Sequence, residues 1–98
     1  MIKSFADKTT AKLFKRDKVI GVPPQILKTA YRKLLLIDAA GNINDLRIPP
    51  GNMLEKLSGI LTDKHSIRIN DQWRIVFKWG DNDAYDVEIV DYHKGKYK

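Results

Sequence analysis

Three adjacent side chains near the end of the chain can move or orient protons. They are Asp91, Tyr92 and His93, and they follow the alternating stretch "VEIV". A histidine titrates near neutral pH, a neighbouring carboxylate can orient it, and a phenol can donate a proton or stack on a nucleobase. We call these residues the terminal triplet. The triplet is either an acid–base group or the exposed end of a strand, in which Asp91 ends the strand and Tyr92 packs against the sheet.

Two arginines are predicted to lie side by side on the preceding strands. In "SIRINDQWRIVF" the flanking isoleucine and tryptophan share the core face only if residues 70–72 form the turn between two strands. That register sets Arg68 directly opposite Arg74 on the other face of the sheet. Like charges in this position are destabilising. The pair therefore indicates an anion-binding site, unless Glu88 neutralises both arginines in an exposed ion-pair network.

The last hairpin is predicted to turn at "GDND" and to pair Trp79 with Tyr85. This register brings Val90 beside Arg74, so the terminal triplet emerges next to the arginine pair. Cleavage of RNA without a metal ion requires a base for the 2′-hydroxyl proton, an acid for the leaving 5′-oxygen and fixed cations for the phosphorane charge. Arginine supplies a positive charge that does not titrate.

Other kinds of site are poorly represented. His65 and His93 are the only histidines, and neither has a second ligand at a spacing typical of metal sites. The chain contains no cysteine, which excludes thiolate metal sites, cysteine nucleophiles and disulfides. It has no glycine-rich phosphate loop and no serine in a nucleophile elbow. We therefore expect neither a metal ion nor a cofactor.

The net charge of +6 is unevenly distributed along the chain. Residues 1–40 contain nine Lys and Arg against three Asp, whereas residues 41–98 contain nine residues of each sign. A basic first half and a lysine-rich tail at residues 94–98 would attract RNA or DNA, although solubility alone also accounts for such a charge. No apolar run is long enough to span a membrane, and the first residues lack a secretory apolar region. We expect a single cytoplasmic domain over residues 1–98.

Two helices are predicted in the first half of the chain. The first follows Asp7, a typical N-cap residue, and is expected to end near Asp17. The second begins at Pro24, which suits the first helical turn, and ends before Gly41, which suits the C′ position. Its periodicity gives this helix one apolar face and a second face on which Lys33 lies with other cations.

The remaining segments predict a sheet. "IKSF" is a short strand at the N-terminus, residues 49–51 form an irregular surface loop because of two prolines and a glycine, and residues 53–57 form another short strand. The clearest alternation covers three further strands, which begin near residues 66, 73 and 85. Two helices packed against a largely antiparallel sheet make an α+β domain.

The segments "SIRINDQWRIVF" and "VEIVDYH" resemble the HigB toxins, a family within the RelE/ParE superfamily of bacterial toxin–antitoxin modules. The opening "MIKSF" and the central "PPGNMLEKLSG" fit the same family, and the resemblance covers residues 1–93. It implies a compact fold in which two helices pack on a curved antiparallel sheet. It also implies a ribosome-dependent endoribonuclease, an mRNA interferase, that cuts translated mRNA in the ribosomal A site and arrests growth.

The resemblance also implies the partners. The antitoxin of such a module is a HigA-like protein with a helix-turn-helix domain, so the toxin reaches operator DNA only through the antitoxin. The toxin itself contacts the ribosome and mRNA. Two alternatives stay open, namely a non-catalytic member of the superfamily that inhibits DNA gyrase and a degenerate toxin that only binds its antitoxin.

Residue by residue, the family's Asp-Tyr-His falls on the terminal triplet, and the arginine of its Trp-Arg motif falls on Arg74. Some members carry a further catalytic histidine where this chain has Glu55. The resemblance implies that Glu55 acts as a general base there, or that activity is weaker or depends more on the triplet. The tail at residues 94–98 extends past the usual end of the family. The residues expected to contact RNA are Arg68, Lys56, Lys94 and Lys96.

Overall fold

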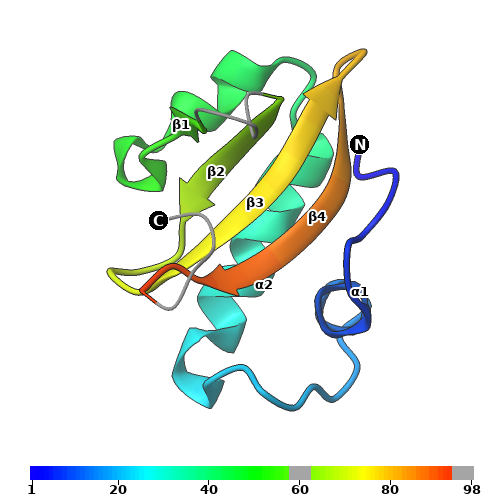
Figure 1. Ribbon diagram of the computed structural model, residues 1–98, viewed down its shortest axis with the longest axis vertical. Coiled ribbons are helices and arrows are strands. Elements are labelled where there is room, and N and C mark those ends of the chain that lie inside the picture. Colours follow the sequence, from blue (N-terminus) through cyan, green and yellow to red (C-terminus); the bar gives the residue numbers. More distant parts are fainter. Residues whose placement is uncertain (58–62, 94–98) are drawn as a thin grey trace.

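The computed structural model describes residues 1–57 and 63–93. Within these residues the four strands form one antiparallel sheet in the order β1-β2-β3-β4, and helix α2 lies across one face of it (Figure 1). This arrangement confirms the α+β prediction. The elements in chain order are α1 (Lys8–Phe14), α2 (Pro24–Ala39), the 3₁₀ helices η1 (Ile43–Arg47) and η2 (Pro50–Asn52), β1 (Glu55–Lys56), β2 (Lys64–Arg68), β3 (Trp73–Gly80) and β4 (Asp83–Asp91).

The hydrophobic core lies between α2 and the face of the sheet that α2 covers, which we call the inner face (Figure 1). Apolar residues recur at helical spacing along α2, and alternate residues of each strand point toward them. Each fully buried Leu, Ile or Phe contributes about 1.5–3 kcal/mol relative to an exposed side chain. The fully buried side chains of this core include Ala30, Leu34, Ile37, Ile67, Ile75, Phe77 and Val87.

Helix α1 begins as predicted and ends early. The Asp7 carboxylate accepts a hydrogen bond from the Thr10 amide at 2.7 Å, which confirms the N-cap. The helix ends at Phe14 rather than near Asp17, because Arg16 adopts the left-handed conformation with φ 63°. A left-handed residue cannot continue a right-handed helix.

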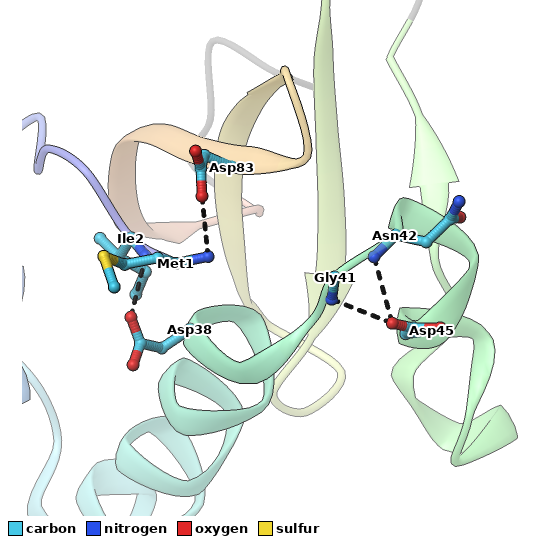
Figure 2. Close-up of polar contacts among 7 residues, drawn as sticks. All are labelled: Met1, Ile2, Asp38, Gly41, Asn42, Asp45 and Asp83. Carbon is cyan, nitrogen blue, oxygen red and sulfur yellow. Dashed lines mark hydrogen bonds and ion pairs between the residues drawn. The ribbon is translucent and has the colours of Figure 1, made fainter.

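Helix α2 begins at Pro24 and ends before Gly41, both as predicted. The helix ends in extended Ala40, so Gly41 does not form a left-handed C′ residue. Instead the amides of Gly41 and Asn42 donate to the Asp45 carboxylate at 3.0 and 3.1 Å (Figure 2). The predicted basic face of α2 does not include Lys33, because this residue is buried, with only 8% exposed.

The first residues of the chain run parallel to β4 and pair with it at two isolated bridges, so the predicted strand at "IKSF" is not continuous. The terminal amino group of Met1 binds Asp83 at 3.1 Å, and the Ile2 amide donates to Asp38 at 2.9 Å (Figure 2). This segment covers a strand edge that would otherwise expose unpaired backbone groups. The bridges join Ile2 to Ala84 and Phe5 to Val87.

The segment between α2 and β2 is more regular than predicted. Residues 50–52 form the 3₁₀ helix η2, although irregular structure was expected there, because the short 3₁₀ turn tolerates Pro50 at its first position. The Ile48–Pro49 peptide bond is cis. The strand expected at residues 53–57 forms as β1, shortened to Glu55–Lys56.

The predicted register is correct at one end of the sheet. Arg68 lies directly opposite Arg74, and Arg74 in turn lies beside Val90. At the other end of β3 and β4 the predicted pairing of Trp79 with Tyr85 is wrong. A bulge at Asp86, whose φ is 51°, shifts the register by one residue, so that Tyr85 pairs with Lys78.

Candidate functional site

Arg74 is held rigidly on the outer face of the sheet, the face away from α2. Its side chain is almost buried, with 8% of the residue exposed. Its Nε donates to the hydroxyl of Ser66 at 2.9 Å, and its Nη2 donates to the carbonyl of Met53 at 2.6 Å. Ser66 is itself fully buried. Two hydrogen bonds in a buried setting therefore fix the plane of the guanidinium group.

The guanidinium group of Arg74 contacts two other side chains that the sequence had singled out. Its carbon lies 5.4 Å from the centre of the Tyr92 ring, and its Nη1 lies 3.8 Å from the Glu55 carboxylate. The Tyr92 hydroxyl donates to the same carboxylate oxygen at 3.1 Å. We call Glu55, Ser66, Arg74 and Tyr92 the outer-face cluster. The cluster unites residues from β1, β2, β3 and the turn after β4.

The protonation of Tyr92 follows from its surroundings. Burial raises the pKa of the Tyr92 phenol, and the negative charge of Glu55 and the hydrogen bond to it raise the pKa further. The positive charge of Arg74 opposes this effect. Because the net direction is upward from about 10, Tyr92 keeps its proton at neutral pH and acts as a hydrogen-bond donor.

Asp91 organises the turn that carries the end of the terminal triplet. One carboxylate oxygen of Asp91 accepts the backbone amide of His93 at 3.1 Å, and the other accepts the side-chain amide of Gln72 at 2.9 Å. The Tyr92 amide donates to the Gln72 carbonyl at 2.7 Å. These bonds tie the turn after β4 to the hairpin between β2 and β3, and they leave the His93 side chain exposed.

Arg68 and Arg74 are neighbours along the backbone but have different environments. Arg68 forms an ion pair with Asp71 in the adjacent turn, whereas Arg74 faces Glu55. The Arg68 side chain is about a third exposed, at 34%, against 10% for Arg74. Arg74 thus belongs to the outer-face cluster, and Arg68 lies at its solvent side.

Lys56, another predicted RNA-contacting residue, is separate from the cluster. Lys56 follows Glu55 in β1 and therefore points to the opposite face, where it pairs across the sheet with His65. Its positive charge helps to lower the pKa of His65, although burial is the larger cause. Lys94 and Lys96 lie outside the described residues.

Two parts of the site were missed in the sequence. Ser66 has no nucleophile-elbow context, yet strand alternation places it on the same face as Arg68, one step from the arginine pair. The Met53 carbonyl has no sequence signal, because every residue carries a carbonyl. Its direction depends on the left-handed conformation of Met53, with φ 45° and ψ 54°.

Two general features of the described residues bear on the kind of site. Within residues 1–57 and 63–93, no group of three or more His, Cys, Asp and Glu side chains is arranged to hold a metal ion. In the same part of the chain, no helix is both long and apolar enough to cross a membrane.

Comparisons with known proteins agree with the resemblance. Residues 3–93 match the family described as "RelE-like toxin of type II toxin-antitoxin system HigB". Toxin HigB-1 of Vibrio cholerae is 41% identical over 95 residues, which cover 96% of this chain and 99% of that protein. Endoribonuclease HigB of Proteus vulgaris is 34% identical over 96 residues, covering 95% of this chain and 100% of the relative.

A solved structure supports the fold independently. The YoeB-YefM complex from Staphylococcus aureus contains a chain that is similar to this one with a TM-score of 0.58 and 23% identity. The likeness covers 95% of this chain and 98% of that chain. Because the family match spans nearly the whole sequence and the relatives are similar over their full length, this chain belongs to the HigB family of RelE-like toxins of type II toxin–antitoxin systems.

Proposed function

We propose that this toxin is an endoribonuclease that cuts mRNA during translation and thereby arrests growth. The observation that carries the proposal is Arg74, a buried and doubly hydrogen-bonded cation beside a protonated phenol and a carboxylate. Fixed positive charge at the position where charge develops is a large contribution to catalysis of phosphoryl transfer. The relative from Proteus vulgaris is named an endoribonuclease, which supports the same reaction.

The reaction we propose is attack of the RNA on its own backbone. Glu55 removes the 2′-hydroxyl proton, the 2′-oxygen forms a bond to phosphorus, and the bond from phosphorus to the 5′-oxygen breaks. His93 donates a proton to the departing 5′-oxygen, so the products carry a 2′,3′-cyclic phosphate and a 5′-hydroxyl. Arg74 stabilises the additional negative charge of the phosphorane, and no metal ion takes part in this route.

The remaining residues have supporting roles in the proposed site. Tyr92 orients Glu55 through its hydroxyl and offers its ring to a nucleobase. Asp91 fixes the turn on which His93 lies. Arg68, at the solvent side of the cluster, contacts the RNA backbone together with Lys94 and Lys96. We do not include Lys56, because it lies on the opposite face from Glu55.

The biological setting that we propose follows from the family. The chain acts as one cytoplasmic domain over residues 1–98 and cuts mRNA held in the ribosomal A site, where its net charge of +6 favours contact with rRNA. Its partner is a HigA-like antitoxin with a helix-turn-helix domain, and operator DNA is contacted through that antitoxin. The family assignment to a type II toxin–antitoxin system supports a protein antitoxin.

The test compares two substitutions to methionine on one strand. Arg74→Met removes the positive charge of the cluster. Lys78→Met removes a positive charge from the same face of β3, four residues away. Each variant is induced in cells, mRNA 5′ ends are mapped, and cleavage is measured with purified mRNA in the presence and absence of ribosomes. We expect Arg74→Met to lower the cleavage rate by about 100- to 1,000-fold, the loss typical of one charge-stabilising group. We expect Lys78→Met to cleave like the wild type, and wild-type cleavage to require ribosomes.

A second substitution separates catalysis from folding. His93 is exposed, so His93→Ala should leave the melting temperature unchanged while it relieves toxicity. Full toxicity in both Arg74→Met and His93→Ala would show that the site is elsewhere. DNA damage with intact mRNA would support the gyrase-inhibiting alternative, and growth unaffected by the wild type would support a toxin that only binds its antitoxin.

A further inference from the structure

Lys33 is a buried lysine on the helical layer of the protein. It is only 8% exposed, although its neighbours Lys28 and Arg32 on α2 are exposed. Its ammonium group donates a hydrogen bond to the side-chain oxygen of Asn52 in η2. Burial lowers the pKa of Lys33, and the nearby charges of Arg32 and Arg68 lower it further. A buried amino group is costly unless it is hydrogen-bonded, so the bond to Asn52 is the interaction that makes this position tolerable.

Asn52 is fully buried and uses both ends of its amide. Its nitrogen donates to the carbonyls of Leu46 and Ile48, at 3.1 and 3.3 Å, which turns its oxygen toward Lys33. An aspartate in this position would offer acceptors only and would oppose two carbonyl oxygens. The amide therefore joins α2, η1 and η2 at one point.

The residues that follow Asn52 lead directly into the outer-face cluster. Met53 is next in the chain, and its left-handed backbone directs its carbonyl to the Nη2 of Arg74 at 2.6 Å. Glu55 follows two residues later, opposite Ser66, with its carboxylate 3.8 Å from Arg74. A displacement of Asn52 would therefore move both the acceptor that holds the guanidinium group and the carboxylate that faces it.

We propose that Lys33 and Asn52 are positioning residues, which brace residues 52–55 against α2 and thereby place Arg74 and Glu55 for RNA cleavage. Lys33 extends from the inner layer and Asn52 is buried, so neither touches the RNA. The brace couples the helical layer to the chemistry on the outer face. This inference rests on the proposed function, because the reaction that the brace serves is the proposed one.

The first test replaces the donor and keeps the buried stem. Lys33→Met removes the ammonium group, and Lys28→Met makes the same change at an exposed position of the same helix. With ribosomes and purified mRNA, we expect Lys33→Met to lower kcat at least about tenfold with little change in KM, since misplacement by about 1 Å can reduce a rate about 100-fold. Lys28→Met should keep the wild-type kcat.

The second test observes Arg74 without any reaction. In the folded wild type the Nε–H of Arg74 is buried and bonded to Ser66, so its NMR signal should be shifted and slow to exchange. Lys33→Met should shift this signal and accelerate its exchange, whereas Lys28→Met should not. Asn52→Asp, which keeps an acceptor for Lys33 and loses both donors, should have the same effect on Arg74. Melting temperatures are recorded for every variant.

The outcomes distinguish this inference from the proposed function. If wild-type protein cuts no RNA, the proposed function is wrong, and the Arg74 signal still decides whether the brace exists. A purely structural lysine would give a lower melting temperature with an unchanged kcat per folded molecule and an unchanged Arg74 signal. That combination in Lys33→Met would overturn the inference. If Asn52→Asp does not fold, Lys33→Met alone decides it.

Discussion

Residues of one type have different roles here because their surroundings differ. Arg68 and Arg74 lie opposite each other, yet Arg68 meets a turn carboxylate near solvent, whereas Arg74 is enclosed by Ser66 and the Met53 carbonyl. The enclosed guanidinium of Arg74 is held in a fixed direction by two hydrogen bonds, and stabilisation of a transition state requires such a fixed direction. Positive charge therefore does not distinguish the two arginines. The hydrogen bonds that immobilise the guanidinium group of Arg74 distinguish them.

One substitution can separate the two proposed roles of the Tyr92 side chain, which are orienting Glu55 and stacking on a nucleobase. Tyr92→Phe keeps the ring near Arg74 and removes the hydroxyl that donates to Glu55. If the hydroxyl orients the base, we expect kcat to fall by up to about 100-fold, because misplacement of a reacting group by about 1 Å can reduce the rate by that factor. Tyr85→Phe on β4 is the matched control and should cleave normally. An unchanged kcat in Tyr92→Phe would limit Tyr92 to stacking.

Among the elements, the N-terminal segment and α1 together complete the free edge of β4. The segment of residues 1–6 exchanges backbone hydrogen bonds with β4, and where it turns into α1 a side chain continues the series. The hydroxyl of Thr10 accepts the Ile89 amide at 3.0 Å. The edge next to the candidate site is thereby kept from pairing with another chain.

Thr10→Val tests this contribution to stability. Valine has nearly the shape of threonine, so the substitution mainly leaves the Ile89 amide without its acceptor at a fully buried position. We expect a loss of about 1–3 kcal/mol in the free energy of unfolding, measured by urea denaturation, with faster hydrogen exchange at Ile89. Thr9→Val, one residue away and half-buried, should change the free energy of unfolding by less than about 0.5 kcal/mol. Equal effects of the two substitutions would contradict this role for Thr10.

The whole molecule has two layers that are joined through the segment between α2 and β2. Helix α2 covers the inner face (Figure 1). The outer-face cluster lies on the opposite face of the sheet. His65 lies on the inner face, where its ring stacks on Phe77 with centroids 6.3 Å apart. Its Nδ1 is buried and has no hydrogen-bond partner within the described residues. Protonation of His65 would therefore place a charge against the Phe77 ring on the inner face.

Stability should for this reason decrease in mild acid. Burial, and then the charges of Lys56 and Arg47, lower the pKa of His65 in the folded protein. Below about 6.5, the ordinary pKa of histidine, the unfolded chain binds a proton that the folded protein still excludes. The stabilising contribution is therefore complete above that pH and is lost as the pH falls from there to the folded pKa. His65→Phe should remove this part of the pH dependence.

Urea denaturation at pH 7.5 and pH 5 measures this effect. The wild type should lose more stability between the two values than His65→Phe does. His93→Ala, which removes an exposed histidine, should keep the wild-type difference. The same pH dependence in the wild type and His65→Phe would show that His65 does not contribute to it.

The sequence by itself determined the two helices, the three longer strands and much of their register. Helical spacing predicted α2, Asp7 predicted the start of α1, and the alternation of apolar residues placed Arg68 opposite Arg74. These features depend on the helical spacing of apolar residues and on the alternation of strand side chains between two faces, and both can be read from neighbouring residues. The predicted register is wrong between Asp86 and the hairpin turn that joins β3 to β4. The bulge adds one residue to β4 there, and the apolar pattern of the sequence does not reveal it.

Only the tertiary structure decided which of the chemically able residues meet. The hydrogen bond between Tyr92 and Glu55 spans 37 positions of the sequence, and the contact of Lys33 with Asn52 opposes the helical pattern that predicted an exposed lysine. Such contacts depend on how α2, η2 and the sheet pack, and no local pattern reports the packing of distant elements. The direction of the Met53 carbonyl is of the same kind, because it is set by one backbone conformation. The sequence thus predicted the terminal triplet and the two arginines as candidate site residues, and packing brings Arg74, Tyr92 and Glu55 into contact.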